Sequence, residues 1–336
     1  MARFKIAADT RLDSERKIIA ILKVLSQFSS PVGSNAISRE LTRNGLKLSE
    51  RAVRYHLKIA DEYGFTELVG REGRLITLRG LEEIKLALVP EQVGYILDKV
   101  ETIAFQTTFD PSKRSGQIPV SIVLVDKNKF RKMLAAIKPV FKAGICVSDR
   151  VKVLPEGERI GPIVVPQGKL GLLIVSASVF DGVLLKSGIP TEYLFGGILE
   201  VSNQAPKRFV GIVNYSGTSL HPGEQFMRAG MTAVRKAART GNGMVLAAFR
   251  EIPGIAKILA EERIAMLEES GIGGVISLGN IGEPVCQHPV STNRVGIVLV
   301  SSMNPAAAAF EAGIDIEVAA PCGVIDFYEL ISFWDL

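Results

Sequence analysis

The sequence predicts a mixed α/β protein that begins with a winged helix-turn-helix and continues into a larger part made of two related α/β lobes. Three observations predict this. Residues 1–80 hold 15 Lys and Arg against 9 Asp and Glu, whereas residues 81–336 hold 25 against 26. The basic segment shows three short helical patterns followed by a β-hairpin pattern, and the rest of the chain contains an internal repeat.

Composition bounds the class of protein. The chain has 336 residues, 47% hydrophobic and 22% charged, which is typical of a globular protein with more than one domain. Apolar runs such as Leu170–Val175 are strand-sized, too short to span a membrane, and Met1–Thr10 has no signal-peptide core. Cys146, Cys286 and Cys322 lie far apart, which argues against disulfides and a metal site. We therefore expect a cytoplasmic protein with no cofactor, no metal and no membrane partner.

The first helical pattern begins at Ser14 and ends before Pro31, with apolar residues at helical spacing. Ser34 is expected to cap a second helix that stops at Gly45. Ser49 is expected to cap a third helix, which turns Val53, Leu57 and Ala60 inward and leaves four side chains outward: Arg51, Arg54, Tyr55 and Lys58.

A hairpin pattern follows, with strands expected at Thr66–Val69 and Leu75–Leu78 around a turn at Gly70–Arg74. Three helices and a hairpin in this order predict a winged helix. In such a domain the third helix enters the major groove of DNA, so the four outward residues are the candidates for DNA contacts. Arg71 and Arg74 on the wing are expected to reach phosphates. The alternative is a winged helix that contacts proteins.

The segment Leu81–Phe109 has apolar residues at helical spacing, interrupted at Pro90, and predicts one or two helices that link the domains. The polar break Asp110–Gly116 is the expected boundary. We therefore expect a DNA-binding domain at 1–81, linker helices at 82–115 and a sensor domain at 116–336.

The repeat aligns Gly171–Ile189 with Gly296–Ile314 without gaps, with identical residues at five of 19 positions. Each copy predicts a strand, a polar turn, a helix and a Gly-Ile exit. This predicts two lobes related by a pseudo-twofold axis.

Polar turns precede three expected helices in this part of the chain. They are Ser176–Ser178, Ser301–Asn304 and Tyr215–Ser219, with Asn304 expected as an N-cap and a helix starting near Pro222. Free backbone N–H groups and hydroxyls at helix starts suit carboxylates or phosphates. Simple helix capping by these serines is the alternative.

An enzyme is not expected. The sequence has no GxSxG, HExxH, P-loop or dinucleotide fingerprint, and its three histidines lack carboxylates at motif spacing. Cys146 is expected to be a buried structural thiol.

Four motifs in order carry a resemblance to a known family. They are Ser178–Pro190, Phe195–Val201, Tyr215–Pro222 and Phe249–Pro253. Together with Ser49–Leu57 in the third helix, they resemble the NrpR regulators of archaea over essentially the whole chain. Some members carry two sensor domains, whereas this chain has one, which implies a homodimer.

The resemblance implies a repressor of nitrogen-assimilation genes that binds a palindromic operator in double-stranded DNA and is released by 2-oxoglutarate. A dicarboxylate needs helix N-termini and a cation, and Arg250, Lys186 or Arg208 can supply it. The ligand-binding candidates are Ser176, Ser178, Asp181, Ser216, Thr218, Arg250, Ser301 and Asn304. A sensor of another small anion and a co-repressor acting by protein contacts are the alternatives.

Overall fold

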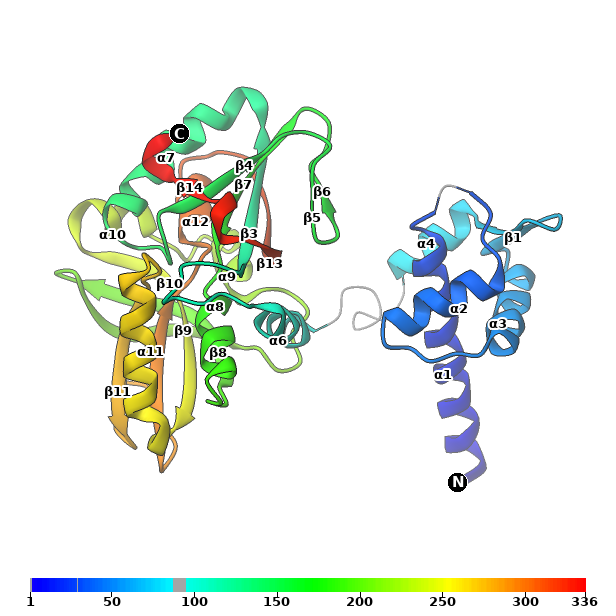
Figure 1. Ribbon diagram of the computed structural model, residues 1–336, viewed down its shortest axis with the longest axis horizontal. Coiled ribbons are helices and arrows are strands. Elements are labelled where there is room, and N and C mark those ends of the chain that lie inside the picture. The colour runs from blue at the N-terminus through cyan, green and yellow to red at the C-terminus, as the bar shows by residue number, and fades with distance from the viewer. Residues whose placement is uncertain (1, 29, 87–94) are drawn as a thin grey trace. The chain divides into compact units, whose positions relative to one another are not determined.

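The computed structural model describes residues 2–28, 30–86 and 95–336. Contacts divide the chain into two compact units, Met1–Gly94 and Tyr95–Leu336 (Figure 1). No helix in the described part of the chain has the length and apolar character that a membrane span requires.

The N-terminal unit is a winged helix. Its elements are α1 (Ala2–Leu25), α2 (Ser34–Arg43), α3 (Glu50–Glu62), β1 (Thr66–Val69), β2 (Gly73–Ile76) and α4 (Leu78–Leu86). Helices α1, α2 and α3 pack around one apolar core that includes Leu25, Leu41 and Leu57. A second cluster joins α1 to Phe65 beside the hairpin. The helix order and the hairpin confirm the predicted winged helix.

Local boundaries differ from the predictions at three places. Helix α1 begins at Ala2, well before Ser14. The N-cap of α2 is Gly33, and the Ser34 hydroxyl donates to Glu50 Oε1 across 3.0 Å instead of capping. Strand β2 ends at Ile76, and Leu78 already begins α4. The Ser49 cap is as predicted, because its hydroxyl accepts a bond from the Ala52 N–H at 3.2 Å.

The C-terminal unit begins with α6 (Ile96–Gln106). The predicted linker segment 82–115 includes this helix, and its part at 87–94 lies outside the described residues. Helix α6 packs on α8 within the unit. The contact is close because Gly182 of α8 has no side chain: a Cβ there would lie 2.5 Å from the Thr107 Cβ and 2.8 Å from the Ala104 carbonyl oxygen.

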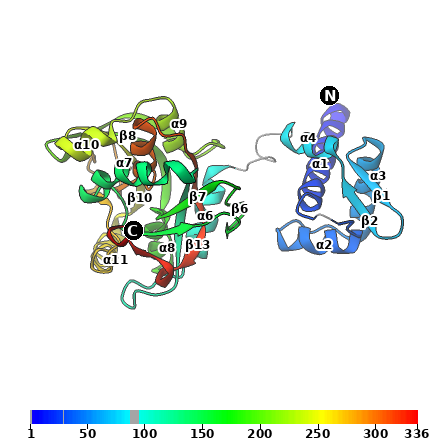
Figure 2. The same ribbon diagram turned by 90° about the horizontal axis from the view of Figure 1, so that it is seen from above.

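Two five-stranded antiparallel sheets form the centre of this unit (Figures 1 and 2). The first has the order β13-β3-β7-β4-β14, and the second has the order β11-β12-β10-β8-β9. The strands are β3 (Gln117–Asp126), β4 (Arg150–Leu154), β5 (Arg159–Ile160), β6 (Ile163–Val164), β7 (Lys169–Val175), β8 (Glu192–Ser202), β9 (Ala205–Asn214), β10 (Gly243–Pro253), β11 (Val275–Ile281), β12 (Arg294–Val300), β13 (Glu317–Asp326) and β14 (Ile331–Ser332).

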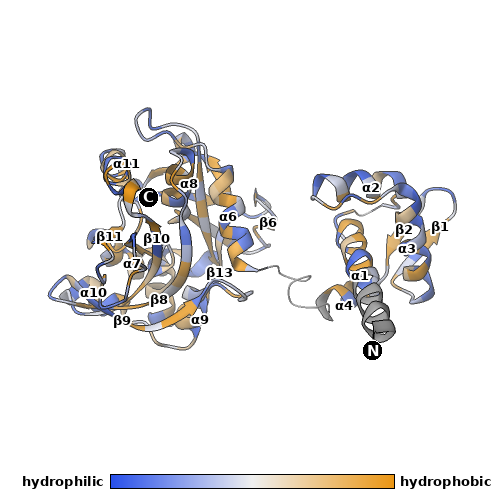
Figure 3. Cartoon of the chain, turned by 90° about the horizontal axis from the view of Figure 1, so that it is seen from below, coloured by the Kyte–Doolittle hydropathy of each residue, from blue (hydrophilic) through white to orange (hydrophobic). Residues whose placement is uncertain are grey.

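Helices connect these strands. They are α7 (Phe130–Lys142), α8 (Ser178–Lys186), α9 (Pro222–Arg228), α10 (Val234–Thr240), α11 (Lys257–Glu269) and α12 (Asn304–Glu311), with short 3₁₀ turns η1 (Lys127–Lys129), η2 (Gly254–Ala256), η3 (Phe327–Glu329) and η4 (Phe333–Asp335). The strands are largely hydrophobic, whereas α10 is mostly hydrophilic (Figure 3).

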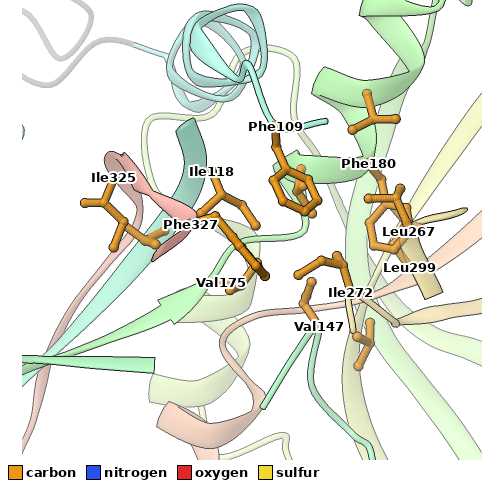
Figure 4. Packing of buried hydrophobic residues seen from close by; sticks show 14 of the residues in the cluster. Phe109, Ile118, Val147, Val175, Phe180, Leu267, Ile272, Leu299, Ile325 and Phe327 are labelled. Carbon is orange, nitrogen blue, oxygen red and sulfur yellow. The ribbon is translucent and has the colours of Figure 1, made fainter. Parts of the chain in front are cut away.

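The two predicted lobes are present, and the repeat is longer than the sequence alone indicates. Apart from the small hairpin β5-β6, which lies between β4 and β7 only in the first half, the order β3-η1-α7-β4-β7-α8-β8 recurs as β10-η2-α11-β11-β12-α12-β13. Each half places its last strand in the sheet of the other, since β8 pairs with β10 and β13 pairs with β3. The elements β9, α9 and α10 form an insertion between the two halves. The exchange ties the two lobes into one unit with a shared core (Figure 4).

Candidate nucleic-acid interface and effector site

The exposed face of α3 carries the four residues that the sequence assigned to DNA contacts. Arg51, Arg54, Tyr55 and Lys58 are all exposed, and Tyr55 is 63% exposed. Their spacing places them along one side of the helix, opposite the buried Val53, Leu57 and Ala60. His56 is buried, and its ring packs beside that of Tyr55.

Arg54 is partly neutralised in the free protein. Its Nη2 lies 2.6 Å from Glu50 Oε1, with the arginine side chain still 65% exposed. Arg54 and the Ser34 hydroxyl lower the pKa of Glu50. A phosphate or a base edge therefore has to compete with Glu50 for this guanidinium, whereas Arg51 and Lys58 carry no such partner in the described residues.

The wing separates its two arginines. Arg71 is exposed in the turn between β1 and β2. Arg74 lies inside β2 and not in the turn, where its Nε and Nη2 donate to the Asp61 carboxylate at 2.8–3.0 Å. Asp61 also accepts a bond from Thr66. Arg74 thus attaches the base of the wing to α3, and Arg71 is the wing cation that faces solvent.

A bridge between Val32 and Arg74 gives the wing a short third strand. Gly73 is required at this contact, because a Cβ there would lie 2.3 Å from the Val32 carbonyl carbon, and its φ is +131°.

In the C-terminal unit, the serine turns cap backbone groups. The Ser176 hydroxyl accepts from the Ser178 N–H at 3.3 Å, and the Ser301 hydroxyl accepts from the Met303 N–H at 3.2 Å. Ser176, Ser178 and Ser301 are buried. These hydroxyls serve the turn geometry in both halves, so a ligand would have to displace those bonds.

Asn304 is the first residue of α12, and its N-cap is Met303, which corrects the expected cap at Asn304. The Asn304 amide instead pairs with the backbone of Leu246, accepting from its N–H at 2.8 Å and donating to its carbonyl at 2.9 Å. In the other half, Pro119 occupies the position of Leu246 and Val179 that of Asn304. Because proline has no N–H to satisfy, no amide is needed there.

Two candidates from different halves meet in the interior. Arg250 of β10 is 3% exposed and Asp181 of α8 is 1% exposed. Arg250 Nε lies 3.1 Å from Asp181 Oδ1, and Nη2 lies 3.5 Å from Oδ2. The guanidinium carbon also lies 4.4 Å from the Tyr193 ring centre and 4.8 Å from that of Tyr215. The Arg250 guanidinium therefore contacts one carboxylate and the faces of two aromatic rings.

Burial dominates the electrostatics of this ion-pair cluster. It raises the pKa of the Asp181 carboxyl, and the adjacent Arg250 opposes that shift. It also raises the pKa of Tyr193. Burial, helped by the charge of Arg250, lowers the pKa of His221 to about 4. His221 is the N-cap of α9, where its Nδ1 accepts from the Gly223 N–H at 3.1 Å and must be unprotonated.

The other candidates lie elsewhere. Lys186 lies 4.8 Å from the Phe105 ring centre, and Arg208 pairs with Glu200 on the surface. Ser216 is exposed. The Thr218 carbonyl accepts from the Ile96 N–H at 2.9 Å, which ties the turn after Tyr215 to the first residue of α6. Both ends of α6 are therefore held by segments that also contribute to the ion-pair cluster. The first residue of α6 is bonded to Thr218, three residues after Tyr215, and its last turn packs on Gly182, which follows Asp181.

The pseudo-equivalent place in the other half is apolar. Repeat register matches Arg250, Tyr193 and Asp181 with Val123, Val318 and Ala306, and the pairs Arg250–Tyr193 and Val123–Val318 are each cross-strand neighbours. These three residues pack in one hydrophobic cluster. Only one such ion pair is therefore built among the described residues.

Sequence reasoning missed Tyr193 and His221 as neighbours of Arg250. Tyr193 meets Arg250 through the register of β8 on β10, which has a bulge between Phe249 and Arg250. No local sequence pattern predicts that Tyr193 and Arg250 are cross-strand neighbours. Cys146 is buried as predicted, and burial raises the pKa of its thiol to about 12.

Comparisons with known proteins agree with both units. Residues 93–332 match the family described as NrpR regulatory domains NRD1 and 2, and residues 19–84 match the ribonuclease R winged-helix domain. A relative in Methanosarcina mazei, named global nitrogen regulator NrpRI, is 37% identical over 93% of this chain and 96% of its own length. The global nitrogen regulator NrpR of Methanocaldococcus jannaschii is 30% identical, and the match covers 54% of that longer protein.

A crystal structure of a nitrogen repressor-like protein from Methanococcus jannaschii is similar with a TM-score of 0.60 and 25% identity. The match covers 72% of this chain and 99% of that one. The family match spans most of the chain, and the Methanosarcina relative is matched over nearly its whole length. The chain therefore belongs to the NrpR family of nitrogen regulators.

Proposed function

We propose that this chain is a transcriptional repressor of nitrogen-assimilation genes that binds a palindromic operator as a homodimer and leaves it when 2-oxoglutarate binds. The observation that carries the DNA-binding role is the exposed row on α3, Arg51, Arg54, Tyr55 and Lys58, in a family of nitrogen regulators. The helix would enter the major groove, with Arg71 of the wing on a phosphate.

For the effector, the Asp181–Arg250 pair is the proposed point of action. A buried arginine needs a counter-ion, and a carboxylate of 2-oxoglutarate would replace Asp181 beside it. The cavity next to the pair, lined also by Thr191, holds only about 10 Å³, so binding requires the lobes to move. The Thr191 hydroxyl is buried without a partner there and would gain one.

The route to the DNA-binding unit would run through α6. Its first residue, Ile96, is bonded to Thr218, and its last turn rests on Gly182 next to Asp181. Displacing Asp181 would therefore shift α6, which follows the DNA-binding unit in the chain. Release from DNA follows if the effector binds one arrangement more tightly than the other.

The test is binding of the full chain to its own upstream palindromic DNA, followed by fluorescence anisotropy with and without millimolar 2-oxoglutarate. Weakening by 2-oxoglutarate, but not by glutamate or succinate, is the expected result. Binding that ignores 2-oxoglutarate would contradict the effector, and weak, salt-insensitive binding would contradict the direct DNA contact in favour of protein contacts. Calorimetry should give one 2-oxoglutarate per chain, since the pseudo-equivalent place is apolar.

A further inference from the structure

A second cavity, of about 1000 Å³, lies where the two halves meet, and only Val275 lines both it and the small cavity beside the ion pair. The first half contributes the end of α7, the second half contributes β11 and β12, and the insertion contributes α10. Its floor is apolar and includes Ile145, Val245 and Val300. Lys142 and Arg239 stand on its rim, each at or near the end of its helix.

The pseudo-symmetry shows what this space would be if it were ordinary core. In the repeat register Ile145, Val245 and Val300 correspond to Ile272, Ile118 and Val175. Those three residues belong to a buried cluster that also contains Phe109 and Phe327 (Figure 4). Val300 of the cavity floor joins the same cluster, whereas Val245 does not.

The two phenylalanine rings lie 4.9 Å apart in that cluster. Phe109 precedes the first half and Phe327 follows the last strand of the second, so both come from outside the repeated strands and helices. Among the described residues, no aromatic ring lines the equivalent place in the second sheet, and an open cavity remains there.

The charges of the cavity are of one sign. None of its 18 lining residues is Asp or Glu. The two neighbouring helices, α7 and α10, together contain seven Lys and Arg and no acidic residue. Across the described residues, neither Lys142 nor Arg239 makes an ion pair with a carboxylate.

We infer that this cavity binds an anion that carries an apolar body, the anionic group meeting Lys142 and Arg239 and the body covering the floor of Ile145, Val245 and Val300. Its volume lies at the upper end of ordinary ligand pockets, roughly 300–1,000 Å³, so a small dicarboxylate alone would leave most of it empty. A nucleoside monophosphate and a medium-chain fatty carboxylate share the required chemistry. The site is independent of the proposed action at Arg250.

The test is isothermal titration calorimetry of the full chain, which measures the dissociation constants of four probes: AMP, dodecanoate, adenosine and tripolyphosphate. AMP or dodecanoate should bind, and whichever binds identifies the source of the apolar body. Adenosine and tripolyphosphate, which each carry only one half of the chemistry, should bind at least about tenfold more weakly. Failure of both AMP and dodecanoate to bind would overturn the inference, as would tripolyphosphate binding as tightly as they do.

Variants locate the binding. Lys142→Glu and Arg239→Glu should each weaken the bound probe about tenfold, because they replace a partner of the anion with a like charge. Lys132→Glu is the matched control, an exposed lysine on the same helix that does not line the cavity. Equal weakening by the control would mean that net charge alone matters and would overturn the site.

A filling variant tests the apolar part. Ala238 is half-buried on α10 and lines the cavity, so Ala238→Trp should close it and abolish binding of either probe. Circular dichroism and the melting temperature show whether this variant is folded. If it does not fold, Thr240→Trp, at the exposed end of the same helix, replaces it. Undiminished binding by a folded filling variant would contradict the inference.

Discussion

Arg250 on β10 and Asp181 on α8 form a buried ion pair in which Nε and Oδ1 are 3.1 Å apart, and each residue comes from a different half of the repeat. The pair therefore joins the two halves at one point. A buried charge that loses its partner destabilises a protein far more than the intact pair stabilises it.

Arg250→Met is expected to destabilise the chain by about 3–5 kcal/mol, because it leaves Asp181 buried without a counter-ion. The double variant Arg250→Met with Asp181→Leu should regain most of that stability. Urea unfolding measures both. The response to 2-oxoglutarate should be lost in both variants, which separates the effector role from stability. A double variant that is stable and still responds would remove Arg250 from the effector site.

Stability should fall as pH drops from about 6.5 towards about 4, since His221 is unprotonated in the folded chain until its pKa of about 4. The unfolded chain binds a proton to this histidine near pH 6.5, so acid favours unfolding in this window. The expected loss by pH 5 is about 1–2 kcal/mol for this half-buried group, from 1.4 kcal/mol per pH unit. His221→Asn, which keeps a capping oxygen, should flatten this part of the profile, and an unchanged slope would contradict the assignment.

Gly182→Ala should loosen the packing of α6 on α8, because its Cβ would lie 2.5 Å from the Thr107 Cβ. The expected cost is about 1–3 kcal/mol. Hydrogen exchange should speed up in α6. Gly33→Ala is the control, since a Cβ there meets nothing within 4 Å. If both variants behave alike, the close approach of the two helices is not required.

Asn304→Val should cost about 1–3 kcal/mol, because the buried Leu246 N–H loses the oxygen that it donates to at 2.8 Å. The reciprocal change, Val179→Asn, should also destabilise, since Pro119 offers no N–H to the new amide. Thermal melts compare the two. A neutral Asn304→Val would show that the Leu246 backbone finds another partner.

On the winged helix, Arg51→Ala and Arg74→Met should have different effects. Arg51 is exposed, so its loss should weaken DNA binding by about 1–3 kcal/mol with the melting temperature unchanged. Arg74 is bonded to Asp61, so its loss should lower the stability of the unit by about 1–2 kcal/mol. Anisotropy and thermal melts measure the two effects. A melting temperature unchanged in Arg74→Met would contradict its role at the wing base.

Much of the fold was predictable because it depends on local sequence patterns. The spacing of Val53, Leu57 and Ala60 fixes which side of α3 is buried, and therefore which side is free. The Gly-Ile exits at Gly188 and Gly313 mark the ends of the repeated helices, since both glycines have positive φ. The gapless repeat predicted two related lobes because it, too, is a pattern in the order of residues along the chain.

Other features depended on contacts between distant segments. The sequence predicted Ser34 as a helix cap, but its hydroxyl donates a hydrogen bond to Glu50 of another helix. Arg74 looked like a free wing cation, but Asp61 lies within reach once the hairpin folds back on α3. The exchange of β8 and β13 between sheets has no local signature, because pairing partners are chosen by register and burial across the whole unit.

By itself, the sequence determined the winged helix, its exposed basic row, the two related lobes and the family. Those depend on residue periodicity and order, which are local properties of the chain. Only the tertiary structure decided that Arg250 pairs with Asp181 between two tyrosines, and that one half keeps a cavity where the other is filled by Phe109 and Phe327. Burial and pairing of this kind are set by which segments come together, and no short stretch of sequence contains that information.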